Sequence, residues 1–230
     1  MKIVKASVRI PEDQLDRVLL KRLERYARIC YKSEDKMQTT PGDSFIRSIM
    51  RNGHESVIEH EKITLLLVTD RGVTHEVVRH RIGSYSQEST RYCNYNKEKF
   101  GSEITVIEPC FYEKEDPRYE LWHKGCLNAE MSYFAMLEAG ATPQEARSVL
   151  PNSLKTEIAV TYNMREWRHF LRLRADKSAH PQARELAIPI LKTFQKVFPE
   201  LFSDIPYDET FPLKQCAEVI ITDELFRARD

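Results

Sequence analysis

The sequence predicts an α+β fold within one domain, and three observations support this class. The chain of 230 residues is long enough to bury one sizeable core, and nothing in it resembles a flexible partition. Candidate strands and helices follow one another without the regular βαβ rhythm of a doubly wound sheet. No GxGxxG or Walker loop occurs, so we expect neither a Rossmann nor a P-loop site. If nucleotides bind, side chains must hold them.

The first half of the chain is predicted to contain two strands and three helices. Pro11, followed by two acidic residues, suits a helix start, and Gly53 suits a helix end. The expected elements are a strand over 1–10, a helix over 11–31, a loop over 33–41, a helix over 43–50, a strand over 63–69, a helix over 72–81 and a loop over 82–92. The stripe of the first helix is predicted to comprise Leu15, Val18, Leu19, Leu23 and Tyr26.

The second half is predicted to contain two more strands and four helices. The expected elements are a strand over 104–107, a helix over 116–139, a helix over 143–149, a strand over 155–162, a helix over 164–174 and a helix from about 181. In the long helix, apolar residues recur at helical spacing and are expected to face the core: Leu127, Met131, Phe134 and Leu137.

Composition excludes several functional classes. The 35 basic residues cancel the 35 acidic ones, so no global field favours nucleic acid or an anionic membrane. The cysteines are odd in number and scattered, which fits neither a disulfide framework nor a CxxC metal pair: Cys30, Cys93, Cys110, Cys126 and Cys216. No signal peptide is apparent, and the longest apolar run is too short to span a bilayer. We therefore expect a soluble, cytoplasmic protein.

A basic cluster is the strongest chemical feature. Arg79, His80 and Arg81 are consecutive, and Arg91 follows ten residues later, across a stretch rich in hydroxyl and amide groups. Such a cluster can be a solvated face or can pair with neighbouring glutamates. Alternatively, guanidinium groups beside Ser and Thr donors can bind phosphate oxygens. The second interpretation predicts a phosphate site.

The stretch RHRIGSYSQESTR, from Arg79 to Arg91, resembles the signature of the flavin-dependent thymidylate synthases. That signature is Arg-His-Arg, seven residues and then Ser, and Ser89 stands at the last position. Four further blocks occur in the same order: GHESVIEH over 53–60, ARSVLP over 146–151, Asn163 with Arg165, and LRLRAD over 171–176. The similarity extends over roughly residues 45 to 190, and a long motif with companion blocks is a strong signal.

The resemblance implies a single domain of that type over 1–230, with a mainly antiparallel sheet flanked by helices. It assigns FAD binding to Ser56, Glu59, Arg79, His80, Arg81, Gln87, Asn163, Arg165 and His169. It assigns dUMP binding to Glu76, Arg79, Gln87, Glu88, Ser89, Thr90, Arg91, Arg147 and Arg174. It implies a homotetramer whose active sites draw residues from several subunits.

The implied reaction is methylation of dUMP to dTMP. Methylenetetrahydrofolate would donate the carbon, and FAD reduced by NADPH would donate a hydride, leaving tetrahydrofolate. Arg174 is the expected catalytic residue, because a permanent cation at the uracil ring favours negative charge at nitrogen 3. Some relatives carry Gln at position 76, Glu at 87 and Asn at 169. Glu76 and Gln87 could therefore exchange charge between two positions facing one substrate.

Other interpretations of the same residues remain open. Ser89 could be a nucleophile, although no dependable base adjoins it, and Cys110 after Pro109 superficially resembles the flavin-free enzymes. His75 and His80 nearly spell a zinc-binding HExxH, but a five-residue spacing turns them about 140° apart on a helix. Stacking of RNA bases is a further possibility for Tyr85, Tyr92 and Tyr95.

Overall fold

A computed structural model describes residues 1–37, 43–93, 95 and 101–222. The strands are β1 (Lys2–Val4), β2 (Ser7–Ile10), β3 (Lys62–Asp70), β4 (Gly83–Gln87), β5 (Thr105–Ile107), β6 (Lys155–Asn163) and β7 (Glu218–Ile221). The helices are α1 (Val18–Tyr31), α2 (Asp43–Arg51), α3 (Arg71–Val77), α4 (Pro117–Glu138), α5 (Pro143–Ala146), α6 (Met164–Arg174), α7 (Pro181–Val197) and α8 (Pro199–Phe202). The main 3-10 segment near the site is η3 (Glu55–His60).

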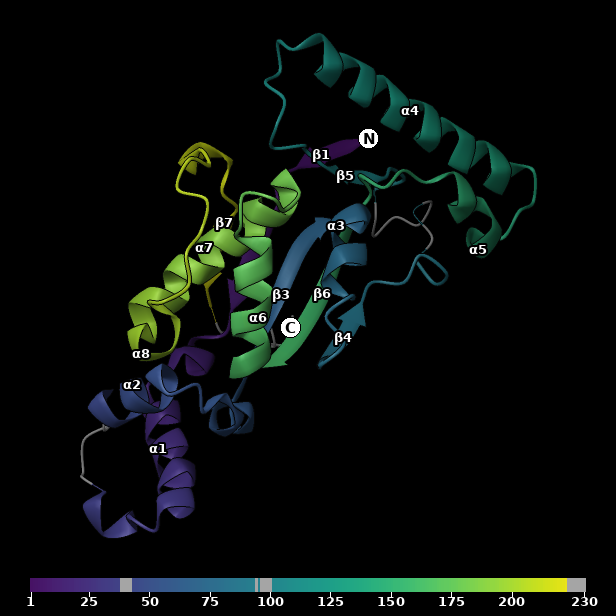
Figure 1. The fold of residues 1–230 in the computed structure, drawn as a ribbon. Helices are drawn as coiled ribbons and strands as arrows, with labels where there is room; N and C mark the ends of the chain where they lie inside the picture. Colours follow the sequence, from purple (N-terminus) through teal and green to yellow (C-terminus); the bar gives the residue numbers. More distant parts are fainter. Residues whose placement is uncertain (38–42, 94, 96–100, 223–230) are drawn as a thin grey trace.

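The centre of the molecule is a five-stranded sheet of order β4-β6-β3-β2-β7 (Figure 1). Its first three pairings are antiparallel, and its last pairing, of β2 with β7, is parallel. β1 and β5 form a separate parallel pair. The predicted mainly antiparallel α+β fold is therefore confirmed.

The longest strand pair explains why the sheet is stable. In β3, apolar residues are buried along nearly the whole strand, as Ile63, Leu65 and Leu67 show. In β6 burial alternates, so Ile158, Val160 and Tyr162 share one face. Both patterns were visible in the sequence, and the predicted strands at 63–69 and 155–162 are confirmed with small extensions.

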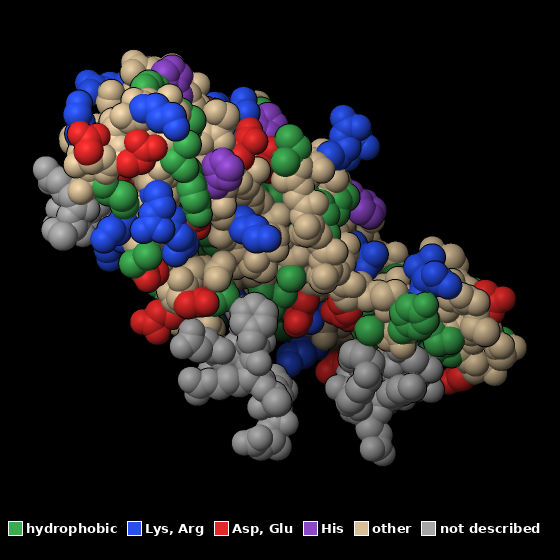
Figure 2. All heavy atoms as spheres, turned by 90° about the horizontal axis from the view of Figure 1, so that it is seen from below, with side chains coloured by type: hydrophobic (Ala, Val, Ile, Leu, Met, Phe, Trp, Pro, Cys, Tyr) green, Lys and Arg blue, Asp and Glu red, His purple; other side chains and the backbone are tan. Residues whose placement is uncertain are grey.

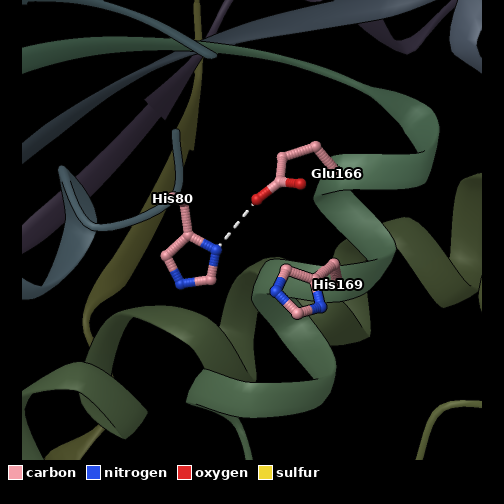
Figure 3. A group of neighbouring side chains, drawn as sticks. All are labelled: His80, Glu166 and His169. Atoms are coloured by element: carbon pink, nitrogen blue, oxygen red, sulfur yellow. Dashed lines mark hydrogen bonds and ion pairs between the residues drawn. The ribbon is translucent and has the colours of Figure 1, made fainter. Parts of the chain in front are cut away.

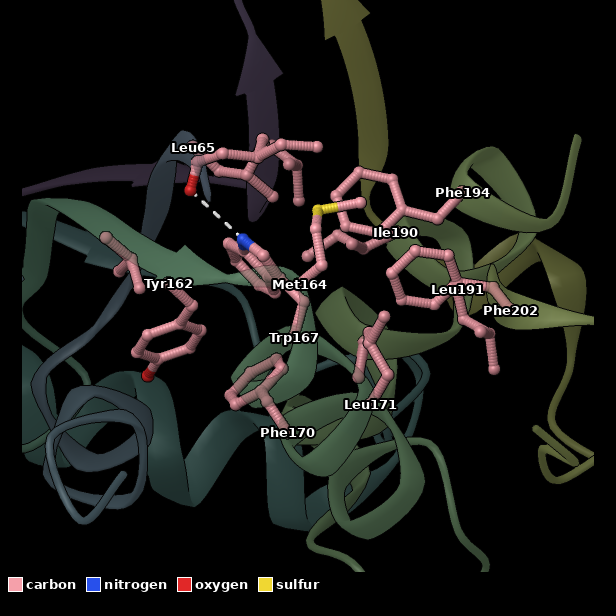
Figure 4. Packing of buried hydrophobic residues seen from close by; sticks show 14 of the residues in the cluster. Leu65, Tyr162, Met164, Trp167, Phe170, Leu171, Ile190, Leu191, Phe194 and Phe202 are labelled. Carbon is pink, nitrogen blue, oxygen red and sulfur yellow. Dashed lines mark hydrogen bonds between the residues drawn. The ribbon is translucent and has the colours of Figure 1, made fainter. Parts of the chain in front are cut away.

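Helices α6, α7 and α8 pack beside one another on the sheet and supply several of the core's aromatic side chains. Trp167 of α6 is fully buried, and its indole N–H donates to the Ile63 carbonyl at 3.0 Å. Figure 4 shows Trp167 and Phe170 between Tyr162 on one side and the Phe194 and Phe202 rings on the other. Helix α6 is thus fixed rigidly against β3 and β6, and its polar face is positioned accurately.

A second, smaller cluster lies under the long helix α4, which extends beyond the sheet in Figure 1. Only Cys126 and Tyr133 of α4 are buried. Of the four residues expected to face the core, Met131 is 68% exposed, so that part of the prediction is wrong; the other three are partly buried. Asp116 begins the helix by accepting a hydrogen bond from the Arg118 N–H.

Two predicted elements of the N-terminal region are each divided in two. The strand over 1–10 breaks at Lys5–Ala6, where the chain leaves β5 and joins β3 and β7. The helix from Pro11 begins as a 3-10 turn, and Asp16 then accepts from the Val18 N–H and starts α1. Because α1 begins only after this turn, its buried face differs from the predicted one. Val18, which was expected in the apolar stripe, is 49% exposed.

The signature region differs most from its prediction. The helix expected over 72–81 ends at Val77, and the loop expected over 82–92 contains β4. Within the described part of the chain β4 pairs with β6 alone, at the edge of the sheet, where a strand of small polar residues suffices. The chain turns after α3 to place β4 antiparallel to β6, and Gly83 then lies directly against the Tyr162 ring. Part of the loop expected over 33–41 lies outside the described residues, and 34–36 form a 3-10 turn.

Surface charge is mixed. On the face in Figure 2, blue basic side chains are interspersed with red acidic ones and form no continuous basic field. In the described part of the chain, every helix is too short or too polar to cross a membrane. An anion site on this face must therefore come from a local arrangement of side chains.

Candidate active site

The signature divides into three segments. Arg79, His80 and Arg81 lie in the turn after α3, Gly83–Gln87 form β4, and Ser89 to Arg91 follow that strand. Arg79 and Arg81 are exposed, whereas His80 is only 5% exposed. The idea that Arg79–Arg81 lie on a helix is wrong, because α3 has already ended. The turn directs the central His inward and the two Arg side chains outward.

His80 lies against α6. Its Nδ1 is 2.9 Å from Oε1 of Glu166, and its ring centroid is 5.3 Å from that of His169 (Figure 3). The Phe170 ring meets it edge-on at 5.0 Å. Burial, with Arg174 and His169 nearby, lowers the pKa of His80 from 6.5 to about 4. His80 is therefore a neutral imidazole near pH 7.

Arg174, at the last turn of α6, joins this group to α3. Its Nε donates to His80 Nε2 at 3.3 Å, and Nη1 donates to Glu76 Oε2 at 2.6 Å. A third bond runs from Nη2 to the Glu76 carbonyl at 3.1 Å. The side chain of Arg174 is 21% exposed and that of Glu76 is 32% exposed. Two residues that the sequence assigned to the substrate are thus brought together beside the buried histidine.

His80, Glu166 and His169 also form the one group in the described residues whose donor atoms, all within 4.8 Å, could share a metal ion. This group differs from the HExxH-like reading, because His75 is exposed on α3 and takes no part. A metal on His80 Nδ1 would require the ring proton on Nε2. That proton would face the Nε–H of Arg174, so the observed contacts favour a hydrogen-bonded chain.

A cavity of about 480 Å³ opens beside the start of α6. Its lining includes several residues that the sequence assigned to FAD: Glu59, Asn163, Arg165 and His169. Arg165 pairs with Glu59 at 2.5 Å, and Asn163 caps α6 by accepting from the Glu166 N–H at 2.8 Å. Ser56 lies exposed on η3 next to this wall.

The lining of this cavity combines cationic and anionic side chains. Arg165 lies at the start of α6 and Arg172 in its last turn, and a guanidinium group can bind phosphate oxygens bidentately. The glutamates that now occupy Arg165 would have to release it. His80 has both ring nitrogens engaged, its backbone N–H donates to the Val77 carbonyl at 3.1 Å, and its carbonyl accepts from the Tyr85 hydroxyl.

The residues after β4 lie apart from this cavity. Five residues of strand separate the two ends of the signature, which is about 16 Å at the usual rise. Thr90 is buried and accepts from Arg147 Nη1 at 3.4 Å, while Arg91 is exposed. Glu88 pairs with Lys155 at 3.4 Å, and Gln87 donates to the hydroxyls of Thr74 and Thr156. In this structure Gln87 does not join the group formed by Glu76 and Arg174.

Several residues of the site were absent from the predictions. Glu166 is the most important, and Glu55, Arg168 and Arg172 also line the cavity. Helical spacing could have revealed Glu166, because it stands three residues after Asn163 and three before His169 on one face of α6. Arg168 is buried in ion pairs with Glu55 and Asp204, which tie α6 to neighbouring segments.

Two rival interpretations gain no support from the geometry. Of the three tyrosines proposed to stack RNA bases, Tyr92 is 78% exposed but Tyr95 is 5% exposed. The Tyr85 hydroxyl contacts backbone carbonyls and Tyr162, so no open aromatic platform forms from the three rings. Burial raises the pKa of the Cys110 thiol, which makes that thiol a poor nucleophile.

Comparisons with known proteins give a consistent result. Residues 19–200 match the family described as "Thymidylate synthase complementing protein". A flavin-dependent thymidylate synthase of Geobacter sulfurreducens is 35% identical over 185 residues, covering 77% of this chain and 78% of that protein. One from Mycobacterium sp. (strain JLS) is 36% identical over 217 residues, covering 85% and 82%.

A solved structure supports the fold. The crystal structure of a UMP/dUMP methylase, PolB from Streptomyces cacaoi, bound with 5-Br dUMP, superimposes with a TM-score of 0.68 at 22% identity. The match covers 88% of this chain and 96% of that one. From the signature, the site geometry and these relatives we conclude that the chain belongs to the flavin-dependent thymidylate synthases, a family of methyltransferases.

Proposed function

We propose that this chain methylates dUMP to dTMP with FAD as its cofactor, NADPH as reductant and methylenetetrahydrofolate as carbon donor, in the cytoplasm. The observation that carries the proposal is the convergence of Arg174 from the block over 171–176, His80 from the signature, and Glu76 from α3 just before it. A permanent cation, partly buried and fixed from two sides, is what activation of a uracil ring requires.

Within this proposal, the chain's own residues bind, orient and polarise. Three hydrogen bonds tie the Arg174 guanidinium to Glu76 and His80, and its remaining N–H groups are available to a pyrimidine. There the cation stabilises negative charge developing at nitrogen 3 and the adjacent carbonyls. Ser89, Thr90 and Arg91 hold the nucleotide phosphate, and Arg147 supports Thr90.

The flavin site would be the cavity beside α6. Arg165, Asn163 and His169 would hold FAD there, with Arg79 and Arg81 reaching in from the turn after α3. When bound and reduced, FAD supplies the hydride that completes the methyl group. The glutamates around Arg165 keep its guanidinium oriented until a phosphate replaces them.

We further propose that residues 1–230 form one domain that assembles as a homotetramer with shared active sites. Two observations support shared sites. The signature ends lie about 16 Å apart along β4, so one chain does not bring all its assigned residues to one point. Helix α4 also exposes large apolar side chains, including Leu121 at 70% and Met131 at 68%, which a partner chain could cover.

A spectroscopic titration tests the function. The purified protein should show a flavin absorption band, NADPH should bleach it, and dUMP with methylenetetrahydrofolate should restore it under anaerobic conditions. Omitting dUMP is the matched control and should leave the band bleached. A protein that cannot be reconstituted with FAD, or whose reoxidation ignores dUMP, would overturn the proposal.

A further inference from the structure

Glu166 is a buried carboxylate that the proposed reaction does not use. It is the third residue of α6 and is 7% exposed. An acidic residue at this position often folds back to the N-cap backbone, but here its carboxylate points away from that end of the helix, toward His80 (Figure 3). The backbone N–H of Glu166 is capped separately by Asn163. The helix end therefore does not account for the direction of its carboxylate.

The contacts of His80 determine which nitrogen carries its proton. A neutral imidazole has one N–H donor and one acceptor, and a guanidinium can only donate. Because Arg174 Nε–H is directed at His80 Nε2, that nitrogen must be the acceptor. Nδ1 then carries the proton and donates it to Glu166 Oε1 at 2.9 Å. Only if a protonated Glu166 donated its hydroxyl to Nδ1 would the pattern reverse, and an N–H of His80 would then face an N–H of Arg174.

We propose that Glu166 is a positioning residue: it fixes His80 as the Nδ1–H tautomer, and His80 thereby orients the guanidinium of Arg174 toward the pyrimidine. The hydrogen bonds connect Glu166 at the start of α6 to His80 in the turn after α3, and His80 to Arg174 in the last turn of α6. Glu76 of α3 holds the other side of the same guanidinium. This inference rests on the proposed role of Arg174 in dUMP methylation.

The side chains around His80 support this arrangement of donors and acceptors. Arg174 and Glu76 face His80 from one side, and Glu166 and His169 from the other. With Glu166 removed, His80 would lose its acceptor and could adopt the Nε2–H tautomer, which places two donors against each other. Arg174 would then be held by Glu76 alone. In metal sites, loss of the hydrogen-bond acceptor that fixes a histidine tautomer typically costs about 10–100-fold in affinity or activity, and we expect a loss of this size here.

The first test needs no turnover. Nitrogen NMR of histidine-labelled, flavin-free protein reports which ring nitrogen of His80 is protonated, with His80→Gln identifying the signal. We expect Nδ1–H in the wild type and in Glu166→Gln, whose amide oxygen accepts the same bond. In Glu166→Leu the signal should shift toward Nε2–H. An Nε2–H tautomer in the wild type would overturn the proposal, even if no variant folds.

The second test measures coupling to Arg174. The kcat/KM for dUMP should fall about 10–100-fold in Glu166→Leu and stay within a few-fold of wild type in Glu166→Gln. In an Arg174→Ala background, Glu166→Leu should have little further effect, because both changes disable one group. Additive losses would contradict the positioning role. Absence of dUMP turnover in the wild type, with the Nδ1–H tautomer present, would instead refute the proposed function alone.

Discussion

Two ionisable side chains of this molecule, His80 and Glu185, are both buried, but they differ in how many hydrogen bonds they make. His80 is surrounded by Glu166 and Arg174, and both its ring nitrogens are hydrogen-bonded. Glu185 of α7 is 5% exposed, lies beside the Cys110 thiol, and its Oε2 accepts no hydrogen bond from the described residues. Burial raises the pKa of Glu185 to about 8, so this carboxyl is largely neutral at pH 7.

The difference shows what burial alone can and cannot do. Both groups avoid charge, but only His80 is held in one orientation by partners of fixed donor and acceptor character. Glu185 borders a cavity of about 720 Å³ and simply stays protonated. A shifted pKa therefore does not identify the active site, whereas a fully connected network around the shifted group does.

The largest expected effect concerns Glu185. Below pH 4.5 the carboxyl is protonated in both folded and unfolded chains, and between 4.5 and 8 only the folded chain keeps the proton. Folding stability should therefore fall as pH rises through this window, by on the order of 5 kcal/mol from this one group. In Glu185→Gln this slope should disappear, as measured by denaturant unfolding at pH 5 and pH 8. Equal slopes in both proteins would show that Glu185 is ionised in the folded state.

Removal of the Arg174 cation should have the next largest effect. Arg174→Ala should reduce dUMP turnover about 10²–10³-fold, because a cation placed where charge develops contributes about that much. Flavin content, read from the visible band, should remain high. Arg118→Ala, which removes an exposed guanidinium on α4, is the control and should turn over normally. Unchanged turnover in Arg174→Ala would exclude it from the chemistry.

The pH response of His80 should have the opposite sign to that of Glu185. Its pKa is about 4 when folded and 6.5 when unfolded, so acid protonates the unfolded chain first. Stability should be lost as pH falls from 6.5 to 4, by on the order of 3 kcal/mol. The difference between wild type and His80→Gln at these two pH values isolates this contribution. A difference that does not vary with pH would mean that His80 is protonated in the fold.

A substitution on α4 should have the smallest effect on the folding stability of one chain. Its main effect should be on the oligomeric state. Leu121→Glu should change the unfolding free energy of one chain by less than ~0.5 kcal/mol, because the side chain is 70% exposed. If α4 lies between subunits, light scattering should show a smaller particle. Leu213→Glu, equally exposed at 69%, is the matched control. Identical particle sizes for both variants would place the interface elsewhere.

Sequence reasoning was most accurate where one periodic pattern extended over a whole element. Helix α6 has the predicted limits, Met164 and Arg174, because its apolar face and its N-cap Asn163 agree. It was least accurate at β4, whose polar residues carry no strand pattern and need only one partner strand. The helix that ends at Val77 was predicted to continue to Arg81. The sequence pattern missed this end because the turn that buries His80 depends on contacts with α6.

For the site, the sequence predicted which residues belong to it better than how their side chains are oriented. The resemblance to the family assigned roles to Arg174, Glu76 and His80, and the structure brings these three together. In the structure His80 points inward, and the Arg side chains on either side of it point outward. A run of three basic residues gives no sign of this difference. Glu166 was missed because an acidic residue early in a helix already has an ordinary explanation at the helix end.

The approach of Gly83 to Tyr162 limits how this enzyme can be altered. A methyl group on Gly83 would lie 2.3 Å from a ring carbon of Tyr162, whose hydroxyl in turn donates to the Val77 carbonyl at 3.1 Å. Any side chain at position 83 would therefore push Tyr162 away from the end of α3 and move His80 with it. The glycine in the middle of the family signature is here required by an aromatic ring, so libraries that vary the signature should leave position 83 unchanged.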